Sequence, residues 1–461
     1  MEQLNVVAPY SGEVLGTFPL MGKEEVLDRL ATAYQLYCDH SLWPPLHERI
    51  AILERAAQLI SSRRQELALM AAKEGGKPLK DSLVEIDRAV NGIKVGVAES
   101  YHLKGSQIPM GQSRASEGRL AFTAIYPRGV VFAVSAFNHP FNLIIHQVIP
   151  AIMAGCPVLV KPARRTPISC DNLLQILYEA GLPPQWCQMI LCQRNVTEQV
   201  VADSRVAFLS FIGSEEVGWR LRSMLAPGAS CALEHGGVAP VIVDASGDWQ
   251  RGAPLLVKGG FYHAGQVCVS VQRIFVDQQI VTSFTNLMLE LTAKLQVGDP
   301  ASPDSDLGPL ITLQELERVE QWVEEAVASG GELLCGGQRI GDRCYAPTII
   351  LNPDQQCRLS REEVFGPVIA IYTYQQIDQA VKMANDLNFS FQAAVITNDL
   401  NCGLKLFDQL DAQAVMINDH TAFRVDWMPF GGAQRSGIGV GGIGPTMREM
   451  SVEKMLVFNQ S

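Results

Sequence analysis

The sequence lacks the features that mark nucleic-acid-binding, secreted and membrane-spanning proteins. It carries 37 basic and 48 acidic side chains, a formal net charge of -11. Proteins that bind the phosphate backbone of nucleic acids usually have an excess of positive charge, so a nucleic-acid partner is not expected. Residues 1–5 hold no basic segment followed by an apolar one, so we expect no secretory signal and a cytoplasmic protein. The most apolar stretch, Leu143 to Val160, contains His146, Pro150 and Pro157. Because these residues are unfavourable in a lipid-facing helix, the stretch predicts a buried helix and a strand, with no membrane partner.

Cysteine and histidine are present but are not spaced for a disulfide framework or a metal site. The 11 cysteines are an odd number, and no two of them form a C-x-x-C pair. Reduced thiols are therefore expected. The 8 histidines include no H-E-x-x-H pattern, and we predict no catalytic metal.

What the sequence contains is the alternation of an α/β protein. A length of 461 residues leaves room for two or three domains. From Gly129 onward, apolar strands alternate with helices, and this rhythm predicts a doubly wound parallel sheet whose ligands bind beyond the carboxyl ends of the strands. The expected strands are 130–135, 158–161, 188–191 and 206–212; the expected helices are 50–70, 81–101, 141–154, 168–180 and one beginning near Ser214.

A second α/β unit is predicted after Gly237. Its apolar segments are 238–243 and 273–276, and a glutamate-rich helix follows at 316–328. We place the boundary between the two units near Glu234 to Gly237. The residues 451–458 alternate enough to form a strand.

Two side chains near this boundary are candidates for catalysis. Cys268 follows a glycine-bearing loop, although a free cysteine taken alone is more often a small buried hydrophobe. Glu234 ends an apolar strand and is followed by the paired glycines Gly236 and Gly237. From its position alone, it is equally a general base in a cleft or part of a surface turn.

Three strand ends upstream carry residues suited to binding. Asn138 follows the first strand; its amide could serve as an oxyanion donor or simply cap the next helix. Lys161 closes the next strand. Gly213 and Ser214 precede a helix after another strand, and a lysine together with a helix N-terminus suits ribose hydroxyls and a pyrophosphate.

In type and order, these residues resemble the aldehyde dehydrogenase superfamily. The blocks that carry the resemblance cover nearly the whole chain. The branch that it most resembles handles lactaldehyde, succinate semialdehyde, and phosphono- or sulfo-substituted aldehydes. The matching positions are Pro9 to Gly12, Gly75 to Pro78, Asn138, Lys161, Gly213-Ser214, Glu234, Cys268, Asp306 to Leu310, Glu362 to Pro367, Met428 to Gly432 and Ser436-Gly437.

The resemblance implies an NAD(P)-dependent oxidation of an aldehyde to a carboxylic acid. Cys268 would attack the carbonyl as a thiolate, and its own backbone N–H and the Asn138 amide would bind the resulting oxyanion. Glu234 would draw a proton from the water that hydrolyses the thioester. Cofactor contacts are expected from Lys161 and Glu363 to ribose, from Gly213 and Ser214 to phosphate, and from Phe365.

The resemblance also implies the roles of the segments and an oligomer. The expected fold is α/β, with a dinucleotide-binding domain at 1–105 and 127–236 and a catalytic domain at 237–432. A small β oligomerisation arm is expected at 106–126 and 446–461, with a returning glycine-rich segment at 433–445. Relatives join subunits through a strand such as 451–458, so a homodimer or homotetramer is expected.

Three positions depart from the family pattern. His235 stands where leucine is common and either perturbs Glu234 or points away, and we favour the second. Arg164 occupies the position where many NAD-preferring relatives hold the adenosine ribose with a glutamate. An arginine there could bind a 2′-phosphate, or it could simply point into solvent. We favour the first interpretation, and with it the use of NADP or of both cofactors. The G-x-G-x-x-G match at 439–444 follows no strand and precedes Pro445, so we interpret it as a loop.

Two arginines bear on the substrate. Arg88 and Arg424 occupy segments that line the substrate tunnel in relatives, and two guanidinium groups converging there would bind an anionic tail such as that of succinate semialdehyde. The competing interpretation pairs Arg88 with Glu85 or Asp87, and Arg424 with Asp426. A small neutral aldehyde such as lactaldehyde then becomes the alternative substrate.

Other functions stay open at this point. A CoA-acylating aldehyde dehydrogenase would pass the thioester to a thiol, but Glu234 argues for hydrolysis. A cysteine hydrolase would pair Cys268 with a histidine such as His263, which leaves the dinucleotide features without a purpose. A catalytically silent protein on the same fold would not need both the candidate nucleophile and the candidate base.

Overall fold

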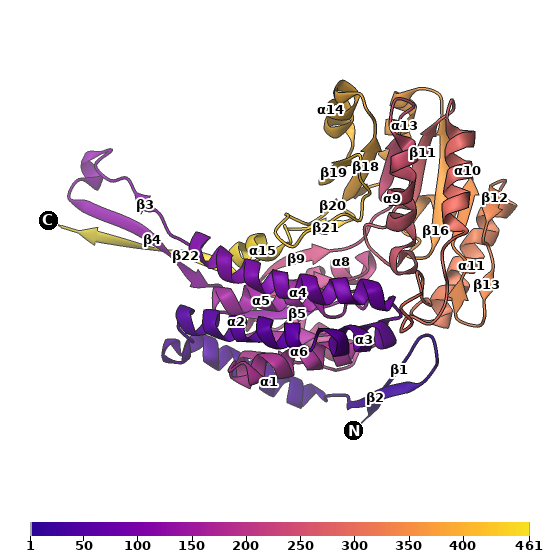
Figure 1. Ribbon diagram of the computed structural model, residues 1–461. Helices are drawn as coiled ribbons and strands as arrows, with labels where there is room; N and C mark the ends of the chain where they lie inside the picture. Colours follow the sequence, from indigo (N-terminus) through magenta and orange to yellow (C-terminus); the bar gives the residue numbers. More distant parts are fainter. Residues whose placement is uncertain (1, 461) are drawn as a thin grey trace.

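The first of two sheets explains the predicted alternation of strands and helices. The computed structural model describes residues 2–460 and contains a six-stranded sheet in the order β21-β9-β8-β5-β6-β7 (Figure 1). All neighbours in this sheet are parallel except β21, which runs antiparallel to β9. Its strands are β5 (Val130–Val134), β6 (Val158–Lys161), β7 (Cys187–Met189), β8 (Val206–Ile212), β9 (Ser230–Glu234) and β21 (Gly437–Ile438).

The strand β5 is wholly apolar because both of its faces are covered. Val131 and Ala133 pack into a core with the helices α2 to α6, whereas Phe132 and Val134 pack into a second core with α1, α7 and α8. The helices of this unit are α1 (Lys23–Cys38), α2 (Leu46–Ser62), α3 (Arg64–Gly75), α4 (Leu79–Glu99), α5 (Asn142–Ala154), α6 (Pro167–Glu179), α7 (Arg194–Val201), α8 (Glu215–Ser223) and α15 (Ile443–Glu449). A hairpin of β1 (Gln3–Val7) and β2 (Val14–Pro19) precedes them.

The second unit is built on a seven-stranded sheet in the order β12-β15-β16-β11-β10-β18-β19, of which only β12 is antiparallel to its neighbour. The strands are β10 (Pro240–Val243), β11 (Arg273–Asp277), β12 (Glu332–Cys335), β15 (Thr348–Leu351), β16 (Val368–Tyr374), β18 (Gln392–Ile396) and β19 (Ala414–Ile417). The helices are α9 (Trp249–Phe261), α10 (Val281–Thr292), α11 (Leu313–Ala328), α12 (Arg358–Arg361), α13 (Ile377–Ala384) and α14 (Leu400–Gln409).

A three-stranded arm extends from the first unit, away from the second (Figure 1). It consists of β3 (Gln107–Ile108), β4 (Arg119–Pro127) and β22 (Ser451–Asn459), in the order β22-β4-β3. Apolar side chains on β22, including Met455, Leu456 and Phe458, are more than half exposed. Two small two-stranded sheets complete the strands: the hairpin of β13 (Arg339–Ile340) with β14 (Cys344–Tyr345), and β17 (Phe389–Ser390) paired with the distant β20 (Ala433–Gln434).

Two sequence-based expectations about elements are wrong. The predicted helix 50–70 is two helices, because the backbone leaves helical geometry at Arg63 (φ -104°, ψ 15°) although no glycine or proline marks the break. The segment 439–444 does follow a strand, the short β21 that ends at Ile438, and its loop is shorter than expected because α15 begins at Ile443. Pro445 lies in the first turn of α15, where a missing backbone N–H leaves no hydrogen bond unmade.

Two buried glutamates fix the starts of α5 and α6. One oxygen of Glu85 accepts the backbone N–H groups of Phe141 and Asn142, both at 2.9 Å, at the start of α5. The two oxygens of Glu74 accept the backbone N–H groups of Ile168 and Ser169, at 3.0 and 2.8 Å, at the start of α6. A carboxylate at a helix N-terminus satisfies otherwise unpaired N–H groups and is favoured by the helix dipole.

The Lys77 ammonium is the countercharge of Glu85, and both side chains are fully buried. Lys77→Met should therefore leave a buried carboxylate without a cation, and the free energy of unfolding should fall by about 3–5 kcal/mol. Urea denaturation followed by circular dichroism measures this loss. Lys80→Met, which breaks the exposed pair with Asp306, is the matched control and should change stability by about 1 kcal/mol or less. Equal effects of the two variants would show that the buried pair has no special role.

Candidate active site

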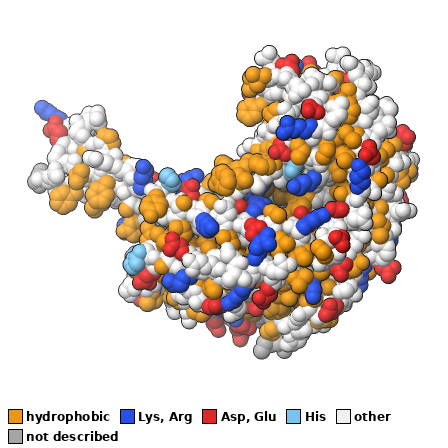
Figure 2. Space-filling model, in the orientation of Figure 1, with side chains coloured by type: hydrophobic (Ala, Val, Ile, Leu, Met, Phe, Trp, Pro, Cys, Tyr) orange, Lys and Arg blue, Asp and Glu red, His pale blue; other side chains and the backbone are white. Residues whose placement is uncertain are grey.

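A cavity of about 610 Å³ lies where the two units meet and opens in the hollow visible in Figure 2. Its walls come from both sheets. From the first unit come Ser135 to His139 after β5, Gly213 and Ser214 after β8, and Glu234 at the end of β9; from the second come Gln266 to Val269, Glu363 and Phe365. The sheet order β9-β8-β5-β6 places the ends of these parallel strands at one edge, so residues that are distant in the sequence become neighbours.

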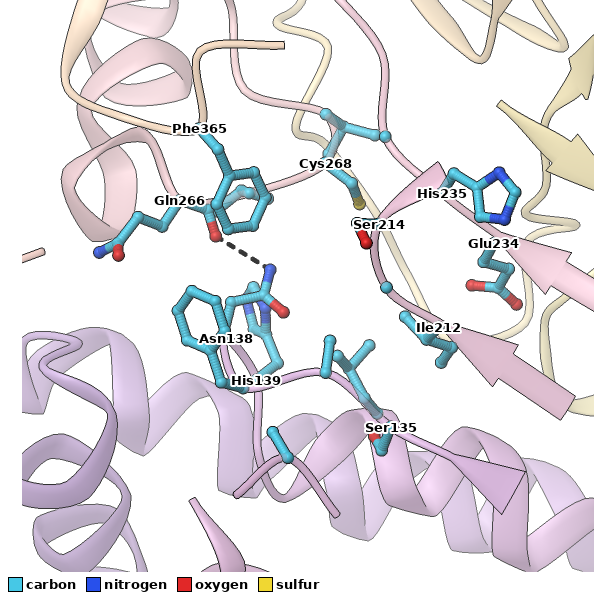
Figure 3. A pocket seen from close by; sticks show the side chains of 18 of the residues that line it. Ser135, Asn138, His139, Ile212, Ser214, Glu234, His235, Gln266, Cys268 and Phe365 are labelled. Carbon is cyan, nitrogen blue, oxygen red and sulfur yellow. Dashed lines mark hydrogen bonds between the residues drawn. The ribbon is translucent and has the colours of Figure 1, made fainter. Parts of the chain in front are cut away.

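Cys268 is presented by a tight turn that follows α9. The backbone φ angles of His263, Ala264 and Gly265 are 49°, 53° and 69°. Residues other than glycine rarely adopt this left-handed conformation. At Gly265 a Cβ atom would lie 2.0 Å from the carbonyl oxygen of Gly366, so the turn depends on this glycine. The Cys268 sulfur points into the cavity (Figure 3).

The surroundings of Cys268 favour the neutral thiol. Burial raises its pKa well above the usual range, and the carboxylates of Glu363 and Glu234 raise it further. The Arg424 guanidinium and the backbone N–H of Cys268 itself lower the pKa. A thiolate in this cavity therefore depends on positive charge and on hydrogen-bond donors near the sulfur.

Asn138 lies below Cys268 in Figure 3 and is held by the loop that carries Cys268. Its Nδ2 donates a hydrogen bond of 2.9 Å to the backbone oxygen of Gln266. Since an amide nitrogen has two hydrogens, this bond orients the side chain and leaves a second donor. Gln266 is held in turn, because its Oε1 accepts the backbone N–H of Ile311 at 2.9 Å.

Glu234 is a half-buried acid whose carboxylate faces the glycine-rich segment. Burial raises its pKa from 4.5 to about 7; Arg424 lowers the pKa and Glu449 raises it. A Cβ atom on Gly441 would lie 2.0 Å from Oε1 of Glu234, so the absence of a side chain at 441 makes room for the acid. A carboxyl with a pKa near neutrality can exchange protons at physiological pH.

His235 turns away from Glu234, as favoured from the sequence. Its Nδ1 donates to the backbone oxygen of Arg435 at 2.9 Å, and its ring contacts those of Phe211 and Trp219, with centroids 5.9 and 5.2 Å apart. The charges that shift the pKa of Glu234 include no contribution from His235.

Glu363 and Lys161 offer unpaired polar atoms that fit a ribose. Oε1 of Glu363 is buried without a hydrogen-bond partner, and burial raises the pKa of this carboxyl to about 8. A Cβ atom on Gly236 would lie 1.8 Å from the same oxygen. The Lys161 ammonium, at the end of β6, forms no ion pair within residues 2–460, and its burial lowers its pKa.

The other predicted cofactor residues occupy different parts of the site. Gly213 and Ser214 line the cavity just before α8, with Ser214 as its N-cap. Phe365, with a φ of 47°, lines the cavity and meets Phe137 edge to face at 5.8 Å. Lys161 and Arg164 do not line the cavity. Arg164 is exposed and donates to Oε1 of Gln193 at 3.1 Å.

Arg88 and Arg424 line the same cavity, but the ion pairs considered from the sequence are wrong. Asp426 pairs with Arg88, at 2.8 Å, and Arg424 forms no ion pair with it. Glu85 pairs with Lys77, and Asp87 with Arg64. The reason is topological: Asp426 lies opposite α4, which brings the carboxylate to Arg88 rather than to its sequence neighbour.

Sequence reasoning missed His146 in this cluster and paired Asp426 with the wrong arginine. Asp426 is bound by His146 as well as by Arg88, and Nε2 of His146 lies 2.9 Å from the Asp426 carboxylate. An ionised carboxylate only accepts, so Nε2 carries the proton and the unprotonated Nδ1 faces Nη2 of Arg424 at 3.3 Å. Burial lowers the pKa of His146 to about 4. Arg424 also lies over the Phe430 ring, with Cζ at 3.5 Å from its centroid.

Other arrangements are not found among the described residues. His263 is fully buried and neither ring nitrogen has a hydrogen-bond partner, so it is not paired with Cys268 and the hydrolase interpretation loses its base. Within residues 2–460, no group of three or more His, Cys, Asp or Glu side chains could hold a metal ion. No helix in that range is both long and apolar enough to cross a membrane.

Comparison with known sequences gives matches over nearly the whole chain. The model of the Aldehyde dehydrogenase family matches residues 1–456. A 3-sulfolactaldehyde dehydrogenase of Priestia aryabhattai is 37% identical over 459 residues, covering 99% of this chain and 95% of the relative. A lactaldehyde dehydrogenase of Methanocaldococcus jannaschii is 34% identical, covering 100% of this chain and 98% of the relative.

Solved structures match equally well. Aldehyde dehydrogenase 21 from Physcomitrella patens, in complex with the reaction product succinate, superposes with a TM-score of 0.95 at 33% identity, covering 100% of this chain and 95% of that chain. Glyceraldehyde-3-phosphate dehydrogenase GapN from Methanocaldococcus jannaschii, complexed with NADP, superposes with a TM-score of 0.94 at 34% identity and 99% coverage of both chains. The expected fold class is confirmed.

Proposed function

The chain belongs to the aldehyde dehydrogenase family, and from this premise we propose that it oxidises a small, anionic aldehyde to its carboxylic acid through a thioester on Cys268, with NADP or NAD as the oxidant. The observation that carries the proposal is the meeting of Cys268, Asn138 and Glu234 in one cavity that also holds Glu363. These four side chains come from four separate segments of the chain and from both sheets.

In the first step, Cys268 attacks the aldehyde carbon as the thiolate, and the π electrons of the C=O bond move to the oxygen, which becomes an oxyanion. Asn138, already oriented by Gln266, and the backbone N–H of Cys268 donate to that oxygen. The nicotinamide supplies, when bound, the acceptor for the hydride that leaves the thiohemiacetal carbon. Cys268 is then acylated as a thioester.

In the second step, Glu234 takes a proton from the water that attacks the thioester, the C–S bond breaks, and the acid and the Cys268 thiolate are released. Its pKa of about 7 means that the base is deprotonated above neutrality. Hydrolysis should therefore slow as the pH falls through about 7. This base favours hydrolysis over transfer to CoA.

The proposal that a nicotinamide dinucleotide binds here is supported by polar atoms that have no partner within residues 2–460. The unpaired Oε1 of Glu363 and the unpaired Lys161 ammonium suit ribose hydroxyls, and the N-terminus of α8 at Ser214 suits a phosphate. Gly236 leaves the space that Glu363 occupies.

The substrate proposal rests on Arg424. It lines the cavity without a carboxylate partner of its own, while His146 and Phe430 hold its guanidinium. Arg88 lines the same wall, although Asp426 neutralises it. The names of relatives support both an anionic and a neutral substrate, since one is a sulfolactaldehyde dehydrogenase and another a lactaldehyde dehydrogenase. Lactaldehyde is therefore the second candidate.

Glu234→Gln tests the reaction path. An amide cannot take a proton from water, so we expect one rapid equivalent of reduced nicotinamide per subunit, followed by steady turnover slowed by about 100-fold or more. Stopped-flow absorbance and intact-protein mass spectrometry measure the burst and the trapped acyl group. Cys268→Ser should abolish both phases. Undiminished steady turnover in Glu234→Gln would rule out its role as the base.

Arg424→Met tests the substrate class. Loss of a charge-assisted hydrogen bond is worth about 1.5–3 kcal/mol, so KM for succinate semialdehyde should rise about 10- to 100-fold while KM for propanal or lactaldehyde changes by less than about threefold. Arg88→Met should have the smaller effect of the two because Asp426 already holds Arg88. Equal changes for charged and neutral aldehydes would favour lactaldehyde.

Arg164→Gln tests the cofactor preference. The exposed Arg164 donates to Oε1 of Gln193, whose Nε2 donates to the carboxylate of Glu2. Arg164 forms no ion pair within residues 2–460, so its guanidinium can donate to a 2′-phosphate. We expect KM for NADP to rise about tenfold, the size of one charge-assisted contact, and KM for NAD to stay unchanged. A wild-type enzyme that strongly prefers NAD would contradict this role.

A further inference from the structure

Arg435 joins the two units across the proposed cofactor cleft. It lies between β20 and β21, and its Nε donates to both carboxylate oxygens of Glu215 at 2.9 and 3.0 Å. Nη2 of the same guanidinium donates to Oε2 of Glu362 at 3.0 Å. Glu215 is the first residue of α8 in the first unit, and Glu362 immediately precedes Glu363 in the second.

The guanidinium is held in place from several sides. Its Cζ lies 4.2 Å from the centroid of the Phe389 ring. The backbone N–H of Arg435 donates to the oxygen of Asn388 at 3.0 Å, and its carbonyl accepts from Nδ1 of His235. A side chain fixed at both ends in this way loses little further freedom when it bridges two acids.

The two acids stand where a dinucleotide would bring negative charge. Glu215 follows Ser214, the proposed phosphate contact, and its charge raises the pKa of Glu363, the proposed ribose contact. Without a cation between them, Glu215 and Glu362 would add two negative charges beside the pyrophosphate. The positive charge of Arg435 lies between the two carboxylates and reduces their combined charge from -2 to -1.

We propose that Arg435 is a positioning residue for the cofactor: it offsets one of the two negative charges of Glu215 and Glu362 and ties the start of α8 to the segment that carries Glu363. This inference rests on the proposed function, because it requires a dinucleotide at the site. It adds a residue that touches neither the substrate nor the catalytic sulfur.

Arg435→Met in the full chain tests the proposal, since methionine keeps the contact with Phe389 but removes the charge. Isothermal titration calorimetry with NADP and NAD at low salt should give Kd values raised about tenfold, because the cofactor phosphates would then lie beside two acids with no positive charge between them. The loss should shrink at high salt, which screens the exposed acids. Arg361→Met is the matched control: it breaks a neighbouring exposed pair with Asp386 and should leave Kd unchanged.

A second variant separates charge from folding. In Glu215→Gln/Arg435→Met, one of the uncompensated acids is gone, so most of the lost affinity should return. Kd within twofold of wild type in Arg435→Met, or no recovery in the double variant, would overturn the proposal. Wild-type protein that binds neither dinucleotide would instead remove the proposed function, so the two failures are distinguishable.

Discussion

The parallel order β9-β8-β5-β6 is the constraint on which the site depends. In a doubly wound sheet the chain runs to one side from β5 to β7 and to the other from β8 to β9, so the loops after β5 and β8 diverge and leave a crevice between them. Asn138 follows β5, Gly213 follows β8, and Glu234 ends β9. The second unit then needs to contribute only one turn, at Cys268, and one loop, at Glu363, to close the crevice.

Burial in this crevice acts in the same direction on three proposed site residues. It raises the pKa of Glu234 to about 7 and of Glu363 to about 8, and raises that of Cys268. Low dielectric disfavours every charge, so three acids placed together would all stay protonated without a cation. Arg424 is the cation that lowers the pKa of both Glu234 and Cys268. An arginine proposed to bind the substrate therefore also favours the charged forms of the base and the nucleophile.

Helices and strands that follow from local hydrophobic patterns could be predicted from the sequence. Contacts between segments that are distant along the chain could not. The alternation after Gly129 identified β5, α5, β6, α6 and β8 because each has its own hydrophobic period. The partner of Arg88 could not be predicted, since Asp426 is 338 residues away along the chain and Asp87 was the nearer candidate. His146 was taken only as a polar residue in an apolar stretch, and no local signal indicates that Asp426 fixes its tautomer. The break at Arg63 likewise has no glycine or proline to mark it.

The glycine-rich segment that follows β21 is also shaped by contacts with distant parts of the chain. In the structure, the space beside Gly441 is filled by the carboxylate of Glu234, while Glu449 from α15 accepts the backbone N–H of Val440 at 3.2 Å. A side chain at 441 would have to displace the acid. The position of the proposed base therefore depends on a glycine some two hundred residues later in the chain.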